Sequence, residues 1–212
     1  GQVQLESGAG ALEFTADRLP ILQRSDRWML LSGKGQAESG WTHLNLQAGF
    51  AVDAGYIEFA ESLPPSLSDD VVLVEHDSGA KEGGLRVTAD VSVDLGERLY
   101  LSAMGLDTRL TGGLQIRMRD GQPMTATGSV ATRDGRFQGY GQNLTIERGL
   151  VNFQGPLDNP GLNIVALRKG LPVEAGISVG GNARRPQVKL VSNPDVPDPE
   201  KLSWIVLGRA PS

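Results

Sequence analysis

The sequence has no cysteine and only two histidines among its 212 residues. The absence of cysteine excludes disulfide bonds, thiol chemistry and thiolate metal sites. His43 alternates with Leu44 on an otherwise polar stretch, which indicates a solvated side chain. Glu75-His76-Asp77 and the nearby Asp69-Asp70 carry possible metal ligands, but a metal site needs three or four ligands that converge in space. We therefore predict neither a metal site nor a cofactor.

The sequence also lacks the motifs of common enzyme classes. It contains neither a Gly-x-Ser-x-Gly elbow nor a P-loop that ends in Gly-Lys-Ser/Thr. Gly33-Lys34-Gly35 and Gly139-Tyr140-Gly141 resemble fragments of nucleotide-binding loops, but neither is predicted to open a helix, so a phosphate would find no helix N-terminus. Asp195 and Asp198 could act as acid and base, yet close pairs are expected by chance among 25 acidic residues. We predict that the chain is not an enzyme.

Long apolar runs and basic clusters are missing as well. No run approaches the roughly 20 apolar residues that span a bilayer, and no basic segment precedes an apolar one as in a signal peptide. We therefore expect neither a membrane anchor nor a signal peptide in this chain. The net charge is −5, with 20 Lys and Arg against 25 Asp and Glu. Because nucleic-acid affinity comes largely from clustered Lys and Arg on phosphates, we predict no nucleic-acid partner.

What the sequence contains is alternation of apolar and polar residues. From Leu85 to Leu95 every odd residue is apolar and every even residue is polar, which predicts a strand with one apolar and one polar face. The same period recurs along most of the chain. The apolar positions of these predicted strands include Leu44, Leu46, Phe50, Val52, Leu85, Val87, Val91, Val93, Leu101, Leu114, Ile116, Met118, Met124, Val130, Phe137, Leu144, Ile146, Val151, Phe153, Leu162, Ile164, Ile177, Val179, Val188 and Leu190.

Turn signals separate the strands at intervals of roughly 8–12 residues, as in all-β meanders. An Asp-Gly pair between alternating strands favours a hairpin turn, because such turns need positive φ. No helical crossover is predicted between Leu44 and Leu190, which excludes a βαβ architecture. The signals are Gly112-Gly113, Asp120-Gly121, Asp134-Gly135, Gly155-Pro156, Asn159-Pro160-Gly161 and Gly180-Gly181-Asn182.

We predict one elongated β-domain over residues 1–191, followed by a linker and a helix over 192–212. Residues 17–31 lack clean alternation and are predicted to be irregular or to form a short helix. In the C-terminal helix, Asp198 is expected as the N-cap and Gly208 as the end. Leu202, Ile205 and Val206 are expected to form its apolar face.

The apolar faces of these strands need a cover, and two architectures supply one. In a β-sandwich, two sheets pack about 10 Å apart with their apolar faces in contact. In an open half-pipe, one folded sheet keeps an apolar interior for a ligand. The alternation alone favours the sandwich. The low aromatic content, 5%, and the long series of hairpins favour the half-pipe.

Three segments resemble the C-terminal domain of the TamB family, the inner-membrane subunit of the translocation and assembly module of Gram-negative bacteria. They are GLDTRLTGGL from Gly105, GRFQGYGQNLTIERG from Gly135 and FQGPLDNPGLNIVALR from Phe153. The C-terminal KLSWIVLGRAP is also similar to the family. The resemblance implies an all-β fold: an elongated, U-shaped, taco-like sheet, antiparallel or mixed, with an apolar groove and a short C-terminal helix. It also implies that the apolar positions given above line the groove.

The resemblance further implies a periplasmic location, as part of a protein anchored in the inner membrane. We expect this chain to be a fragment without that anchor. The implied partners are phospholipid acyl chains and the outer-membrane barrel TamA, contacted mainly through the C-terminal end of the family's proteins. Two functions stay open. One is a conduit that shields acyl chains between the two membranes. The other is a scaffold for assembly of outer-membrane proteins or autotransporters, which pairs its edge strands with a client or with the barrel complex.

Overall fold

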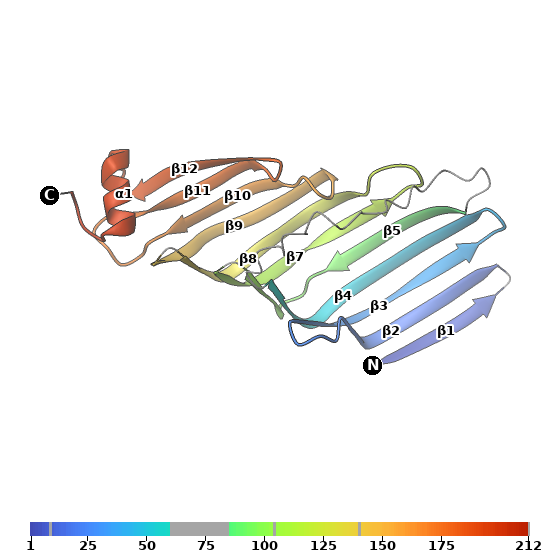
Figure 1. Ribbon diagram of the computed structural model, residues 1–212. Helices are drawn as coiled ribbons and strands as arrows, with labels where there is room; N and C mark the ends of the chain where they lie inside the picture. The colour runs from blue at the N-terminus through green and yellow to red at the C-terminus, as the bar shows by residue number, and fades with distance from the viewer. Residues whose placement is uncertain (9, 60–84, 104, 140, 212) are drawn as a thin grey trace, which may run out of the picture.

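The computed structural model describes residues 1–8, 10–59, 85–103, 105–139 and 141–211. Within them the chain forms one open sheet of 12 strands and a single helix (Figure 1). The elements are β1 (Gln2–Gly8), β2 (Ala11–Ile21), β3 (Arg27–Ser39), β4 (His43–Phe59), β5 (Arg86–Asp94), β6 (Leu99–Ala103), β7 (Leu106–Met118), β8 (Thr125–Gly139), β9 (Gln142–Pro156), β10 (Gly161–Leu167), β11 (Glu174–Asn182), β12 (Arg185–Asn193) and α1 (Asp198–Val206).

The strands follow one another across the sheet almost in chain order. The order is β1-β2-β3-β4-β5-β7-β8-β9-β10-β11-β12, and β6 pairs with β4 and β7. All pairs are antiparallel except β4 with β5 and β4 with β6. The all-β, mixed-sheet prediction is therefore confirmed, as is the C-terminal helix. The sandwich that alternation alone favours is not formed among the described residues, which make a single layer.

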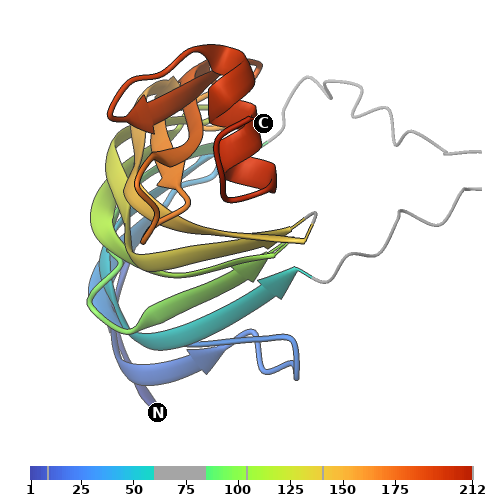
Figure 2. The ribbon, with the colours of Figure 1, turned by 90° about the vertical axis from the view of Figure 1, so that its left-hand side faces the viewer.

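The long strands bend at a row of irregularities that runs across the sheet, here called the crease. The register shifts between Ala16 and Leu19 in β2, and an extra residue, Asp53, interrupts β4 opposite β3. Similar shifts occur in β7–β8 and β9–β10. Residues 95–98 divide β5 from β6 at the same level, because β5 pairs with the first part of β4 and β6 with its last part. Bulges of this kind bend a strand and increase its twist. Figure 2 shows the resulting curvature.

Some local predictions differ from the structure at the crease. The stretch 17–31, predicted as irregular or helical, consists of the end of β2, the connection 22–26 and the start of β3. Asp134-Gly135, predicted as a turn, lies inside β8, where Asp134 has a φ of +54°. The left-handed conformation that Asp tolerates serves a bulge here instead of a hairpin. Gly112-Gly113 likewise lies inside β7, whereas Asp120-Gly121 does separate β7 from β8.

α1 also differs in detail from the expectation. Its N-cap is Pro197 and makes no side-chain capping bond, and Asp198 is already helical. The buried residues are Lys201 and Trp204, while Leu202 and Val206 are exposed. With nine residues, α1 is the only helix in the described part of the chain, and it is too short to cross a membrane.

Candidate functional site

The strand register brings the predicted apolar positions together on one face of the sheet. Residues directly opposite each other on paired strands point to the same side. Ala48 of β4 lies opposite Val91 of β5, which lies opposite Ile116 of β7. Val130 lies opposite Val151, and Val151 opposite Leu162. Every predicted position except Leu85 and Met124 lies within a strand and joins this face. We call the face the apolar wall.

The apolar wall is the concave face of the sheet. Ala175, two residues before the wall residue Ile177 in β11, packs together with Val173 against Trp204 of α1. α1 lies on the concave side of the curved sheet (Figure 2). Since Ala175 and Ile177 point the same way, the apolar wall and α1 occupy the same side.

Most of the apolar wall is covered only in part. In β5, half-buried Val91 and Val93 alternate with exposed Ser92 and Asp94. Fully buried wall residues lie both near the crease, where Val52 is 4% and Leu99 2% exposed, and away from it, where Ala126 is 1% exposed. Elsewhere no second layer of described residues covers the wall, and only α1 lies against it. The wall therefore offers an apolar surface that a chain-like apolar ligand could cover.

The wall extends into β2 and β3, where the sequence analysis predicted no lining residues. Phe14 of β2 stacks on Phe50 with their ring centroids 6.1 Å apart. Ala16 lies opposite Gly33, and after the register shift Leu19 lies opposite Leu31. The alternation of Leu12, Phe14 and Ala16 in the sequence could have identified β2 as a strand that lines the wall. It is lost at the next residues because the bulge at 17–18 changes which positions face inward.

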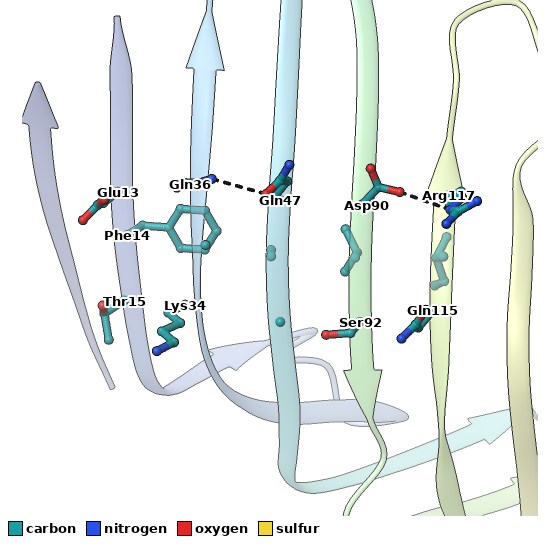
Figure 3. A pocket seen from close by; sticks show the side chains of 15 residues that line it. Glu13, Phe14, Thr15, Lys34, Gln36, Gln47, Asp90, Ser92, Gln115 and Arg117 are labelled. Carbon is teal, nitrogen blue, oxygen red and sulfur yellow. Dashed lines mark hydrogen bonds and ion pairs between the residues drawn. The ribbon is translucent and has the colours of Figure 1, made fainter. Parts of the chain in front are cut away.

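The opposite face of the sheet is polar. A hollow of about 870 Å³ lies over β2 to β5 and β7, and its lining includes polar side chains together with the wall residues Phe14, Ala48, Val91 and Ile116. Figure 3 shows the residues that line it. Its polar side chains alternate along the strands with wall residues and so point to the outer face. Gln36 Nε2 donates to Gln47 Oε1 at 3.3 Å, and Arg117 Nε lies 3.4 Å from Asp90 Oδ1. Both oxygens of Asp90 also accept from Arg119 Nη2, each at 3.0 Å. Charge and apolar surface are thus segregated between the two faces.

The titratable groups considered for catalysis or metal binding do not converge. His43 is exposed at the start of β4, and Asp69-Asp70 and Glu75-His76-Asp77 lie outside the described residues. Asp195 and Asp198 both pair with Lys201 Nζ, at 3.0 and 3.2 Å. In the ranges that the structure describes, no three His, Asp or Glu side chains are grouped as metal ligands would be.

The chain is similar in sequence to known proteins. The whole chain, residues 1–212, matches the family described as TamB C-terminal domain. A protein of Haemophilus influenzae, the translocation and assembly module subunit TamB, is 33% identical over 144 residues. That similarity covers 65% of this chain and 11% of the Haemophilus protein. The chain therefore corresponds to a small part of the length of this relative.

Proposed function

The chain belongs to the TamB family, and from this membership and the geometry of the apolar wall we propose that it forms a segment of a periplasmic conduit for phospholipid. In this proposal the wall shields acyl chains from water on their way between the inner and outer membranes. The carrying observation is the continuity of the wall, which runs from β2 to β12 on the concave face without a covering layer of described residues apart from α1.

The dimensions and chemistry of the wall support an acyl chain as cargo. Neighbouring strands lie ~4.8 Å apart, so the strand path from β1 to β12 extends over about 50 Å. Each buried methylene contributes ~0.8 kcal/mol, and this contribution has to be available along the whole path if a lipid is to slide. Most wall positions are aliphatic, such as Val91, Ile116 and Val151, and give a surface along which an acyl chain can slide.

The remaining assignments follow from the family. The relative's name places that protein in a translocation and assembly module. We propose that this chain is a periplasmic part of an inner-membrane-anchored protein in a Gram-negative bacterium. Its proposed protein partner is the barrel TamA, reached mainly through the C-terminal end of the whole protein.

A matched pair of variants tests the conduit. Val91→Asp places a carboxylate on the wall, whereas Ser92→Asp places one on the outer face, one residue away in β5. We expect Val91→Asp to reduce the amount of bound fluorescent phospholipid by about tenfold or more, because an unpaired charge is costly in apolar surroundings. Ser92→Asp should change it by less than about twofold. Circular dichroism checks that both variants retain the sheet, and Ile164→Asp repeats the test in β10. Equal lipid binding by the three variants and the unmodified chain would refute the conduit.

One observation favours the second candidate, a scaffold for protein assembly. β12 ends the sheet and pairs with β11 alone among the described strands, so its other edge could accept a client strand by β-augmentation. A scaffold of this kind would be impaired by Val188→Pro in β12, because proline cannot donate to a ladder. It would tolerate Val91→Asp. The opposite sensitivities of the two variants separate the two functions.

A further inference from the structure

α1 covers one stretch of the apolar wall, at the C-terminal end of the sheet. Trp204 is 9% exposed and packs against Val173 and Ala175, and Ala175 is completely buried. Leu171 and Ile205 pack around this cluster. Because Ala175 faces the same side as the wall residue Ile177, the indole of Trp204 lies where cargo would lie on the neighbouring strands.

A small set of polar contacts holds α1 in this position. Arg168, just after β10, donates from Nη1 to the carbonyl oxygen of Ile205 at 2.7 Å and to Gln142 Oε1 at 2.9 Å. Gln142, the first residue of β9, donates from Nε2 to the carbonyl oxygen of Val206 at 3.2 Å. These bonds join the C-terminal end of α1 to two strands. At the other end, Lys201 pairs with Asp195 and Asp198.

The side of α1 that points away from the sheet is also apolar. Leu202 and Val206 are 50% and 54% exposed, and on a helix both lie nearly opposite Trp204. Helices with apolar residues all round are normally covered on all sides. No side-chain cap stabilises the N-terminus of α1, and a helix of nine residues has little stability without its packing partners. Its inward position therefore depends on Trp204 and on the polar contacts.

We propose that the patch formed by Leu171, Val173 and Ala175 is an acyl-chain site, and that α1 closes this end of the groove by placing Trp204 on it. The inference rests on the proposed conduit. An acyl chain and the indole bury the same apolar atoms, so they compete for the patch. Arg168 and Gln142 bias the competition toward the closed state, and their contacts are lost when α1 leaves. Lipid that reaches this end of the sheet displaces the helix.

Two measurements on the 212-residue chain test the competition: lipid affinity, and hydrogen exchange of the amides of α1. The probe is a micelle or vesicle of phosphatidylethanolamine and phosphatidylglycerol. We expect lipid to accelerate exchange in α1, because the released helix unfolds. Arg168→Gln should accelerate this exchange without lipid and tighten lipid binding by about fivefold, because a larger fraction of molecules is already open. Gln142→Ala should act in the same direction. Arg185→Gln, at an exposed arginine of β12, is the matched control and should change neither quantity.

The outcomes separate this inference from the function on which it rests. If lipid binds and Val91→Asp weakens binding, but α1 exchanges at the same rate with and without lipid, the conduit stands and the closing helix is wrong. Unchanged lipid affinity in both Arg168→Gln and Gln142→Ala would also overturn the closing helix. If neither the unmodified chain nor Arg168→Gln binds lipid, the conduit itself fails, and the acyl-chain site fails with it.

Discussion

The hydroxyl of Ser32 donates a hydrogen bond to Oδ2 of Asp53 at 2.5 Å, which joins β3 to the extra residue of β4 at the crease. The same hydroxyl oxygen accepts a bond from the backbone N–H of Arg18 at 2.9 Å. Arg18 belongs to the bulge of β2 and has a φ of +46°. One side chain of β3 thus connects the bulges of its two neighbouring strands.

We predict that Ser32→Ala and Asp53→Ala each lower the free energy of unfolding by about 1–2 kcal/mol, since each leaves a half-buried polar partner without its bond. The double variant should lose less than the sum of the two single losses, because both remove the same interaction. Urea denaturation measures all three values. Gln47→Ala, on the exposed outer face, is the control and should stay within about 0.5 kcal/mol. Strictly additive losses would show that the two residues act independently.

Two glycines of β11 should respond differently to the same substitution. A Cβ added at Gly176 would collide with the carbonyl oxygen of Ala166 in β10, whereas one added at Gly180 meets nothing within 4 Å. We expect Gly176→Ala to cost about 2–4 kcal/mol, because the contact is with backbone and the strands have to separate. Gly180→Ala should be nearly neutral. Thermal unfolding of the two variants compares them, and equal stability would contradict the close approach of β10 and β11.

Docking of α1 should depend on pH through Lys201. Its hydrogen bond with Asp195 raises the pKa of Lys201 above its ordinary value of 10.5, and Asp198 adds to the effect, while desolvation opposes it. A raised pKa means that the folded state favours the protonated lysine. Its contribution is therefore complete below pH 10.5 and is lost as the pH rises through the raised pKa. Trp28→Phe and Trp41→Phe leave Trp204 as the single tryptophan. We expect its fluorescence to report the release of α1 as the pH rises above 10.5.

Lys201→Gln is the control for this titration. It removes the charge that Asp195 and Asp198 neutralise, so the docked helix should be weaker at neutral pH. Its fluorescence should also change less as the pH rises above about 10.5, the ordinary pKa of lysine. An identical pH profile in the variant and in the unmodified chain would assign the transition to another group.

The sequence predicted the strands well where alternation is uninterrupted and poorly where bulges interrupt it. In β5 and β7 the odd and even positions of the sequence correspond directly to the two faces. In β2 the bulge at 17–18 changes the inward positions from even to odd. A search for strict alternation therefore fails here, although the chain is extended. The position of a bulge depends on the strands that pair with it, so the pattern of residues within one strand does not predict it.

The inner face of α1 could not be predicted for a different reason. Of the predicted apolar face, Ile205 packs against the cluster of Val173, Ala175 and Trp204. Leu202 and Val206 are exposed, and the buried residues of α1 are Lys201 and Trp204. Burial of Lys201 is acceptable because two carboxylates meet its amine, and one of them, Asp195, lies outside the helix. The choice between one open layer and a sandwich also depends on contacts between distant strands, which alternation does not specify.

Because of the crease, the concave side of the sheet (here called the trough) has a length, measured across the strands, and a depth, measured along them, that can vary separately. The long strands such as β4 and β8 each pass through it, so a residue's place along its strand decides on which side of the fold it lies. Adding a hairpin lengthens the trough by two strand spacings and leaves its cross-section as it was. Moving a bulge along the strands would alter the depth of the two sides and leave the length unchanged. Length and depth can therefore change separately, the first by duplication of a hairpin and the second by a shift of single residues.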